Sequence, residues 1–512
     1  MRKNRIAVIL SLLIISLVSA QPLYSETKTA LTVLAPDDVK AALGKNRVFI
    51  GVDISKMDLS GVDLTSSMLR DSSLEETMLN KAILTDSILI SSGMVSCILQ
   101  HAEMTGVKID NSNLTGADLR NANLTCAVLT SNTMKEVVLS GANLRYGIIR
   151  DNDLSSTVMD NANLSYTFIK SNLSNTNLNK ADMHGACLSD VTLLNANMSD
   201  VNLSAAKLED INMKGSGERH AILAKANLSY ATIEKSKMDY AFLGGAYMHG
   251  ILMNKVDLNN GDLSYAIISN AYITRSEFNK ANLQYAVLAN SSLEGIEFKE
   301  ANLSNADLKK ADLSNAVMTG AAMDSADLSG SYMSRVNLKN ANLFGAKIED
   351  AEMEGADLTS ASLDGAVLIN VNLNKAILIG TSLKNVDLKG FDLSGVKMNK
   401  AQLTGSLLNR VNFSNADLSS AVLRGCDLSG ANLEGADLNS ADLTGVTLER
   451  ANLKDCNLKN AILVNAGMND ADLTGAEIKG ADFTGVDITY VKNIDLAKNP
   501  DKAIGLNITI PE

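Results

Sequence analysis

The chain has 512 residues and a formal net charge of −12, so it is a poor candidate for binding nucleic acid or an anionic membrane surface directly. Hydrophobic residues make up 46% of the chain, but aromatic residues only 4%, and tryptophan is absent. This composition favours a narrow, repetitive core of small and medium-sized aliphatic side chains over several thick globular domains.

The first twenty residues have the order of parts of an export signal. A basic start is followed by a mostly apolar run from Ile6 to Val18, and the small residues Ser19 and Ala20 precede Gln21. Because the apolar run is short for a membrane span, we expect cleavage after Ala20 and export to the periplasm or out of the cell. An uncleaved anchor is the alternative. Removal of the three basic residues of the signal leaves a net charge of −15, and no integral membrane segment is expected in the mature chain.

Residues 21–48 are expected to form an N-terminal segment that includes a short capping helix from Pro36 to Gly44. Asp37 and Asp38 would lie in its first turn, and Gly44 is a typical helix stop. Such a cap would cover the open, unpaired end of the structure that follows.

From residue 49 to residue 490 the chain repeats every five residues. Leu, Met, Ile or Phe recurs at every fifth position from Ile54 to Ile169; one residue is then missing, and the repeat resumes at Leu173 and runs to Ile488 with a single failure at Glu218. A small residue stands two positions before each of these centres, and Asp or Asn often lies between them. Because residues two apart in an extended segment share a face, the small residue and the centre are predicted to point inward and the residue between them outward.

The repeat resembles that of the pentapeptide-repeat proteins, whose signature is Ala-(Asp/Asn)-Leu-x-x. Residues 426–445, CDLSG ANLEG ADLNS ADLTG, carry this signature. The resemblance implies an all-β fold, a right-handed quadrilateral β-helix with four units per coil and about 22 coils, stacked at the ~4.8 Å spacing of paired strands. The absence of proline between residues 37 and 499 agrees with one continuous hydrogen-bonded array.

Residues 491–512 leave the five-residue repeat and are predicted to cap the other end of the coils. A turn is expected at residues 499–501, where Asn499, Pro500 and Asp501 suit a turn. A final extended piece is expected from Leu506 to Ile510.

Few residues of the chain suggest chemistry. The histidines do not converge within coils of twenty residues, so neither a metal site nor a catalytic cluster is expected from His101, His184, His220 and His249. Cys97, Cys426 and Cys456 occupy the small inward position, where cysteine packs as a small hydrophobic residue, and no disulfide is expected within the rod. We therefore predict a protein that is not an enzyme, with no catalytic residues, bound metal or cofactor.

One unit departs from the pattern, and it contains Gly215, Ser216, Gly217, Glu218, Arg219 and His220. Glu218 stands where a buried Leu belongs, and burying an unpaired carboxylate is unfavourable. The unit is therefore predicted to leave the coil as a loop. A functional contact through Ser216, Glu218 and His220 is the alternative, although residues so close in a flexible loop rarely hold catalytic geometry.

Outward residues twenty positions apart should form columns along the rod. One column, counted through the missing residue after Ile169, is apolar at most of its positions: Met68, Ile88, Lys108, Val128, Ile148, Phe168, Cys187, Lys207, Asn227, Tyr247, Ile267 and Val287. Exposed apolar stripes are often binding surfaces. An interaction stripe is therefore predicted, formed by Ile88, Val128, Ile148, Phe168, Tyr247, Ile267 and Val287. The alternative is that the repeat tolerates Ile and Val there because they favour extended backbone.

These observations predict a non-enzymatic, exported scaffold that has a structural or protein-interaction role, with self-association as one form of it. A secreted effector that acts on another cell is an alternative. The resemblance supplies a third, because some pentapeptide-repeat proteins imitate DNA and occupy DNA gyrase, and residues 411–490 here carry 12 acidic and 5 basic side chains. Export and the great length of the chain argue against that third function.

Overall fold

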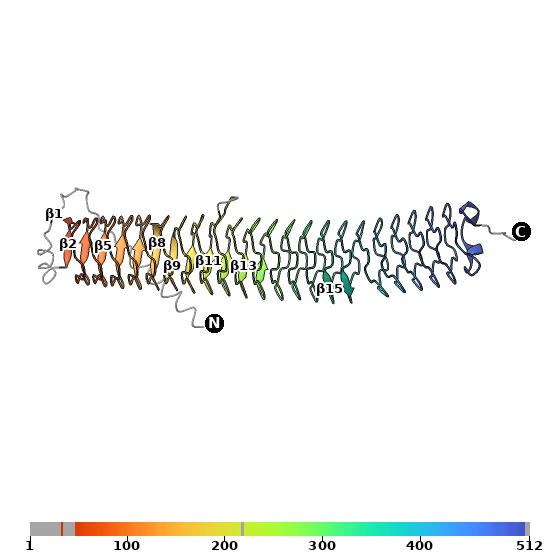
Figure 1. Cartoon of the computed structure of the whole chain (residues 1–512), viewed down its shortest axis with the longest axis horizontal. Coiled ribbons are helices and arrows are strands. Elements are labelled where there is room, and N and C mark those ends of the chain that lie inside the picture. The colour runs from red at the N-terminus through yellow and green to blue at the C-terminus, as the bar shows by residue number, and fades with distance from the viewer. Residues whose placement is uncertain (1–31, 34–46, 217–219, 507–512) are drawn as a thin grey trace.

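The computed structural model describes residues 32–33, 47–216 and 220–506 of the chain. These residues wind into one long rod of stacked coils, with the N-terminal coils at one end and the C-terminal coils at the other (Figure 1). The described ranges contain no α-helix, and none of their elements is long and apolar enough to cross a membrane. The predicted signal (residues 1–20) and the predicted capping helix (Pro36–Gly44) lie outside the described residues.

The coil has four five-residue sides. Asp53 pairs with Ser73 and Ser73 with Gly93, so the chain returns above itself after twenty residues, which is four units. All these pairs are parallel, and one ladder of them continues as far as Lys498. The all-β, quadrilateral β-helix predicted from the sequence is therefore confirmed.

The strands are short and concentrated in the first half of the chain. They are β1 (Thr32–Val33), β2 (Val48–Ile50), β3 (Val52–Asp53), β4 (Met68–Arg70), β5 (Ile88–Ile90), β6 (Lys108–Asp110), β7 (Val128–Thr130), β8 (Ile148–Asp153), β9 (Phe168–Asn172), β10 (Cys187–Ser189), β11 (Lys207–Glu209), β12 (Thr232–Glu234), β13 (Leu252–Asn254), β14 (Tyr272–Thr274), β15 (Lys347–Glu349) and β16 (Val367–Ile369). Strand β2 and strands β4 to β14 form one 12-stranded sheet, in chain order.

The described ranges contain sixteen strands, whereas the repeat predicts about 22 coils, so not every coil contains a strand. The reason is that most units pair with their neighbours through a single bridge residue and are too short to count as strands. Strand β1 pairs with β3 at the N-terminal end of the rod, so residues 32–33 cover part of that end.

The predicted inward and outward positions are confirmed by burial. In one unit, for example, Ala436 and Leu438 are buried, whereas Asp437 between them is half-buried on the outside. The outward carboxylate also closes its corner, because the backbone N–H of Asn439 donates to Asp437 Oδ1 at 3.0 Å. Each coil thus adds inward aliphatic side chains to one continuous core and leaves short polar side chains on the surface.

A buried polar ladder lies inside the rod, beside the 12-stranded sheet. At an ordinary corner the inward residue donates its N–H three residues back, as Val62 does to the Leu59 carbonyl. After β6 and β7 the side chain of the next coil accepts instead: Ser112 N–H donates to Asn132 Oδ1 at 2.9 Å, and Asn132 N–H to Asn152 Oδ1 at 2.8 Å. The same column contains Ser72, Ser92, Ser112, Asn132, Asn152 and Ser171.

The C-terminal end keeps the ladder but widens the spacing. Lys492, Lys498 and Ile504 bridge to the last regular coil, so they lie six residues apart instead of five. The turn predicted at residues 499–501 is a 3-10 helix, η3 (Pro500–Lys502), which follows η2 (Ile494–Leu496). The predicted extended piece after Leu506 lies outside the described residues.

Candidate interaction surface

The 12-stranded sheet presents a regular outer surface along one side of the rod (Figure 1). In each three-residue strand the middle residue is buried, and the first and third residues point outward. We use the name strand face for the outer side of β4 to β14. The column of first residues on this face is Met68, Ile88, Lys108, Val128, Ile148, Phe168, Cys187, Lys207, Thr232, Leu252 and Tyr272.

The interaction stripe predicted from the sequence is wrong as a single column. Ile88, Val128, Ile148 and Phe168 do lie together on the strand face, in β5, β7, β8 and β9. Tyr247, Ile267 and Val287 instead follow Asn202 and Asn227 along the neighbouring side of the rod.

The error comes from the irregular unit near residues 215–220. Lys207 pairs with Thr232 and Asn212 with Lys237, so the chain uses 25 residues to return above itself here, and one unit adds no step to the ladder. Gly215 is buried and Ser216 is exposed, and His220 lies 6.5 Å from the Phe242 ring, measured between ring centroids. Gly217, Glu218 and Arg219 lie outside the described residues.

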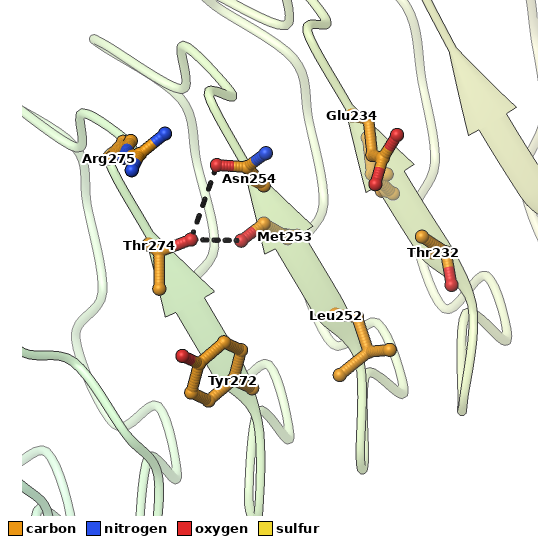
Figure 2. A pocket seen from close by; sticks show the side chains of 9 residues that line it. Thr232, Glu234, Leu252, Met253, Asn254, Tyr272, Thr274 and Arg275 are labelled. Atoms are coloured by element: carbon orange, nitrogen blue, oxygen red, sulfur yellow. Dashed lines mark hydrogen bonds between the residues drawn. The ribbon is translucent and has the colours of Figure 1, made fainter.

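The strand face continues past this unit with side chains that the predicted stripe does not include. Leu252 in β13 is 47% exposed and Tyr272 in β14 is 55% exposed. Together with Thr232 they lie side by side on adjacent strands, as Figure 2 shows. They border a shallow hollow of about 450 Å³. The Thr274 hydroxyl at the hollow lies 3.3 Å from Asn254 Oδ1. At its C-terminal end the strand face therefore combines two exposed apolar side chains, Leu252 and Tyr272, with polar ones such as Glu234, Asn254 and Arg275 around a shallow hollow.

Tyrosine and histidine side chains line the corner that leads into the strand face. Tyr146 and Tyr166 stack with ring centroids 5.4 Å apart, and the Arg145 guanidinium lies over the Tyr146 ring at 4.6 Å. Further along the same corner, the Tyr230 and His249 rings meet edge to face at 5.4 Å. We use the name aromatic corner for Tyr146, Tyr166, His184, Tyr230 and His249. Arginine over stacked tyrosines makes a rigid apolar edge beside the sheet.

The tyrosines of this corner stand at backbone positions that do not favour them. Tyr146, Tyr166 and Tyr230 have φ values of 61°, 59° and 59°, in the left-handed region. A bulky residue is disfavoured there by roughly 1–2 kcal/mol, whereas Gly and Asn are tolerated and are common at the other corners. Tyr240, Tyr265 and Tyr285 stand at the same kind of position on other corners, with φ values of 63°, 58° and 60°, so the rod tolerates tyrosine there and the aromatic corner is distinguished by its place beside the sheet.

Charged side chains form a second outward column on the strand face. These third strand residues include Arg150 in β8 and Lys170 in β9, followed by Glu209 in β11 and Glu234 in β12. The ammonium groups of Lys207 and Lys235 donate to Glu209 at 2.7 and 3.0 Å, and these contacts lower the pKa of the Glu209 carboxyl to about 2. The column thus carries two basic groups over β8 and β9, each paired within the chain (Arg150 with Asp151 at 3.0 Å and Lys170 with Asp190 at 2.9 Å), and two carboxylates over β11 and β12.

The remaining chemically reactive side chains do not assemble into a site in the described residues. Burial raises the pKa of the Cys97 and Cys456 thiols to about 12, which makes both poor nucleophiles. Cys187 is half-buried at the start of β10, and Cys126 is exposed. No group of three or more His, Cys, Asp or Glu side chains that could hold a metal ion is found in residues 47–216 and 220–506.

Two family models match the chain. One, described as pentapeptide repeats, matches residues 48–89, 96–125, 167–195, 281–320, 321–359, 416–455 and 451–489. The other, described as a pentapeptide repeat region, matches residues 356–433. No curated protein matches the chain.

Several solved structures are similar to parts of the chain. HetL, a pentapeptide repeat protein involved in heterocyst differentiation regulation in the cyanobacterium Nostoc, is 27% identical, with 48% of this chain and 91% of HetL covered and a TM-score of 0.19. QnrB1, a plasmid-mediated fluoroquinolone resistance protein, is 16% identical over 36% of this chain and 85% of its own, with a TM-score of 0.19. A pentapeptide repeat protein from the Arabidopsis thaliana thylakoid lumen is 30% identical over 20% and 69%, with a TM-score of 0.15.

Proposed function

Because the chain belongs to the pentapeptide-repeat family, we propose that it is a non-enzymatic scaffold that binds protein along the strand face. One observation carries the proposal: a 12-stranded sheet presents a mostly apolar outward column beside an aromatic corner. Other sides of the rod also carry outward apolar residues, such as Val138 and Val158, and Ile267 beside the stacked Tyr265 and Tyr285, but in the described residues none of them forms a sheet of comparable length.

The strand face has the composition of a binding surface. Ile148 and Phe168 are half-buried in the free rod, so a partner that covered them would remove further apolar surface from water. Tyr146 and Tyr230 are 50% and 64% exposed, and tyrosine is enriched among the residues that contribute most to protein–protein binding. Because these side chains are held on a rigid β-helix, little conformational freedom is lost on binding.

Export to the periplasm or out of the cell is part of the same proposal. It rests on the basic start, the apolar run and the small residues that end at Ala20. The mass of the native protein tests it, and we expect a chain that begins at Gln21 in the exported fraction. A cytoplasmic chain that begins at Met1 would overturn export and would remove the objection to a target such as DNA gyrase.

The scaffold proposal is tested with matched variants of the full chain. I148D/F168D places carboxylates on the strand face, and V138D/V158D places them on outward residues of the same two coils, in a different ladder. Cells that produce each variant are treated with a cross-linker, and the covalently captured proteins are identified. We expect the first variant to lose the captured partners and the second to keep them. Equal capture by both variants would overturn the strand face as the binding surface.

A further inference from the structure

We infer that one occupant of the strand face is a second copy of this chain, packed face to face and antiparallel, with the two-fold axis at β10. The inference rests on the proposed binding role of the strand face and names its partner. Three features of the described residues support it: the order of charges along the face, the positions of two lysines in the apolar column, and the repeat of the surface itself.

The symmetry dictates which residues meet. A two-fold axis that lies between the rods and runs along the strands reverses the order of coils, while the first residue of a strand still faces a first residue and the third a third. Such an isologous contact contains every pair twice. With the axis at β10, β9 faces β11 of the second copy, β8 faces β12, β7 faces β13 and β6 faces β14.

The charges on the strand face are complementary in this register. Lys170 of β9 lies opposite Glu209 of the second copy, and Arg150 of β8 lies opposite Glu234. Lys170 and Arg150 also pair with Asp190 and Asp151 of their own chain, so the contact between copies would extend these ion pairs into a network. Moving the axis to β9 would place Lys170 opposite its own copy and Asp110 opposite Glu234. Moving it to β11 would place Glu209 opposite its own copy. Juxtaposed like charges oppose binding, so the charge order selects the axis at β10 among these alternatives.

The two lysines that interrupt the apolar column find aromatic partners in the same register. Lys207 of β11, whose ammonium donates to Glu209 of its own chain, lies opposite Phe168, and Lys108 of β6 lies opposite Tyr272. Lysine packs its methylene groups against apolar surface, and its ammonium group is attracted to an aromatic face. The aromatic corner also meets itself, because Tyr146 precedes β8 and Tyr230 precedes β12. The lysines are first residues of their strands, whereas the charge order concerns the third residues, so the two columns support the axis at β10 separately.

The size of the surface suits such a dimer. Nine strands, β6 to β14, at about 4.8 Å spacing and about 15 Å of width with the aromatic corner give about 650 Å² on each copy. The total of about 1,300 Å² falls within the range of specific protein–protein interfaces. The strands alone, about 10 Å wide, would give about 430 Å² on each copy, which is below the range of specific interfaces. The aromatic corner must therefore be part of the contact. A second rod also has the same coil-to-coil repeat as the surface it would cover.

Charge reversal in the purified full chain tests the register. R150E and E234R each place like charges across the interface twice, and the R150E/E234R double variant restores opposite charges in swapped order. By sedimentation velocity we expect each single change to weaken dimerisation by about tenfold or more, and the double variant to recover most of it. Single and double variants that weaken the dimer equally, or leave it unchanged, would overturn the register.

The axis itself is tested by cross-linking at Cys187, which lies in β10 and would face its own copy. In a C126S background the other cysteines are buried, so a short bis-maleimide should join two chains through Cys187. We expect covalent dimers from C126S and none from C126S/C187S. A wild-type chain that stays monomeric would overturn self-association. The scaffold proposal would then stand or fall separately, on the partners captured by V138D/V158D but not by I148D/F168D.

Discussion

Residues 48–274 and residues 292–486 share one core and differ on the outside. Leu164 in the first region and Leu433 in the second are both buried centres of the same kind. On the column of the strand face, however, the first region presents Ile148 and Phe168 in strands, and the second presents Asn412, Asn432 and Asn452 at single bridges. The inward residues therefore set the rod, whereas the outward residues differ between its sides and regions and determine what each surface can contact.

The second region contains one instructive exception. β15 and β16 form a two-stranded sheet there, on a different side of the rod from the strand face. Their outward positions include Val367 and Ile369, which are 39% and 48% exposed. β-Branched residues favour extended backbone, as in β16, but they are not sufficient for a strand, because Val138 and Val158 pair through a single bridge, and β15 presents Lys347 and Glu349 outward.

The strongest test of a shared core is truncation of one centre in each region. L164A and L433A should each lower the free energy of unfolding by about 2–5 kcal/mol, because each opens a cavity in a close-packed core. Denaturant unfolding with hydrogen exchange measures both the loss and its extent along the rod, which in a repeat structure can be confined to neighbouring coils. A large loss at one site and none at the other would show that the two cores are not equivalent. D437N, on the outside, is the control and should be nearly neutral.

The next largest effect on stability is expected in the buried polar ladder, which lies in the first region. Asn132 accepts the Ser112 N–H, and its own Nδ2 donates to the Ile109 carbonyl at 2.9 Å, so N132A removes the partner of the buried Ser112 N–H and one bond to a buried carbonyl. We expect a loss of about 2–3 kcal/mol, on the order of the desolvation penalty of such groups. Thermal unfolding measures it.

Ser331 supplies the control in the second region. Its hydroxyl is buried and has no hydrogen-bond partner, and its N–H makes the ordinary corner bond to the Leu328 carbonyl. S331A should therefore be neutral or slightly stabilising. If N132A were equally harmless, the ladder would not stabilise the first region.

The sequence predicts the core well because the inward positions are coded by residue type at a fixed spacing. Leu433, Ala436 and Leu438 follow the five-residue spacing and are buried. The residue missing after Ile169 also appears as expected, because Asp153 pairs with Asn172, one position short of twenty.

The outward columns are harder to predict because they depend on how many units each coil contains. The unit around Glu218 keeps the five-residue spacing, so spacing alone does not show that it adds no step to the ladder. That one unit moved Tyr247, Ile267 and Val287 to another side and brought Leu252 and Tyr272 onto the strand face. The buried ladder was missed for a different reason: Ser and Asn fit the small inward position, and only the altered corner shows why they are polar.

Acid should affect two carboxylates of the first region in opposite directions. Contacts with Lys207 and Lys235 lower the pKa of Glu209 to about 2, so its ionised form stabilises the fold above pH 4.5, and this stabilisation is lost as the pH falls from 4.5 towards 2. Burial, together with Asp239 and Glu277, raises the pKa of Asp257 above 3.8, so its ionised form is unfavourable at neutral pH.

Two amide variants measure these effects in dilute protein. E209Q should be slightly less stable than the wild type at pH 7 and equal to it near pH 2. D257N should be slightly more stable at pH 7, with the difference gone below pH 3.8, where the carboxyl is protonated in both states. Thermal midpoints across this pH range give the comparison. Shifts of the same sign in both variants would contradict the charge environments of the strand face and its neighbour.

The smallest expected effect on stability comes from making the first region resemble the second. I148N/F168N introduces the residue that stands at the same column position in Asn412 and Asn432. Because Ile148 and Phe168 are only half-buried in the free rod, the loss should stay below about 1 kcal/mol for each residue, and the thermal midpoint should hardly move. Hydrogen exchange should quicken at Arg150 and Lys170 as β8 and β9 shorten towards single bridges. V138N/V158N, on another side of the same coils, should change neither measurement.

Early unfolding, on the scale of L164A, would mean that the two side chains are part of the core. Unchanged exchange in a stable variant would mean that outward residues do not decide where strands form.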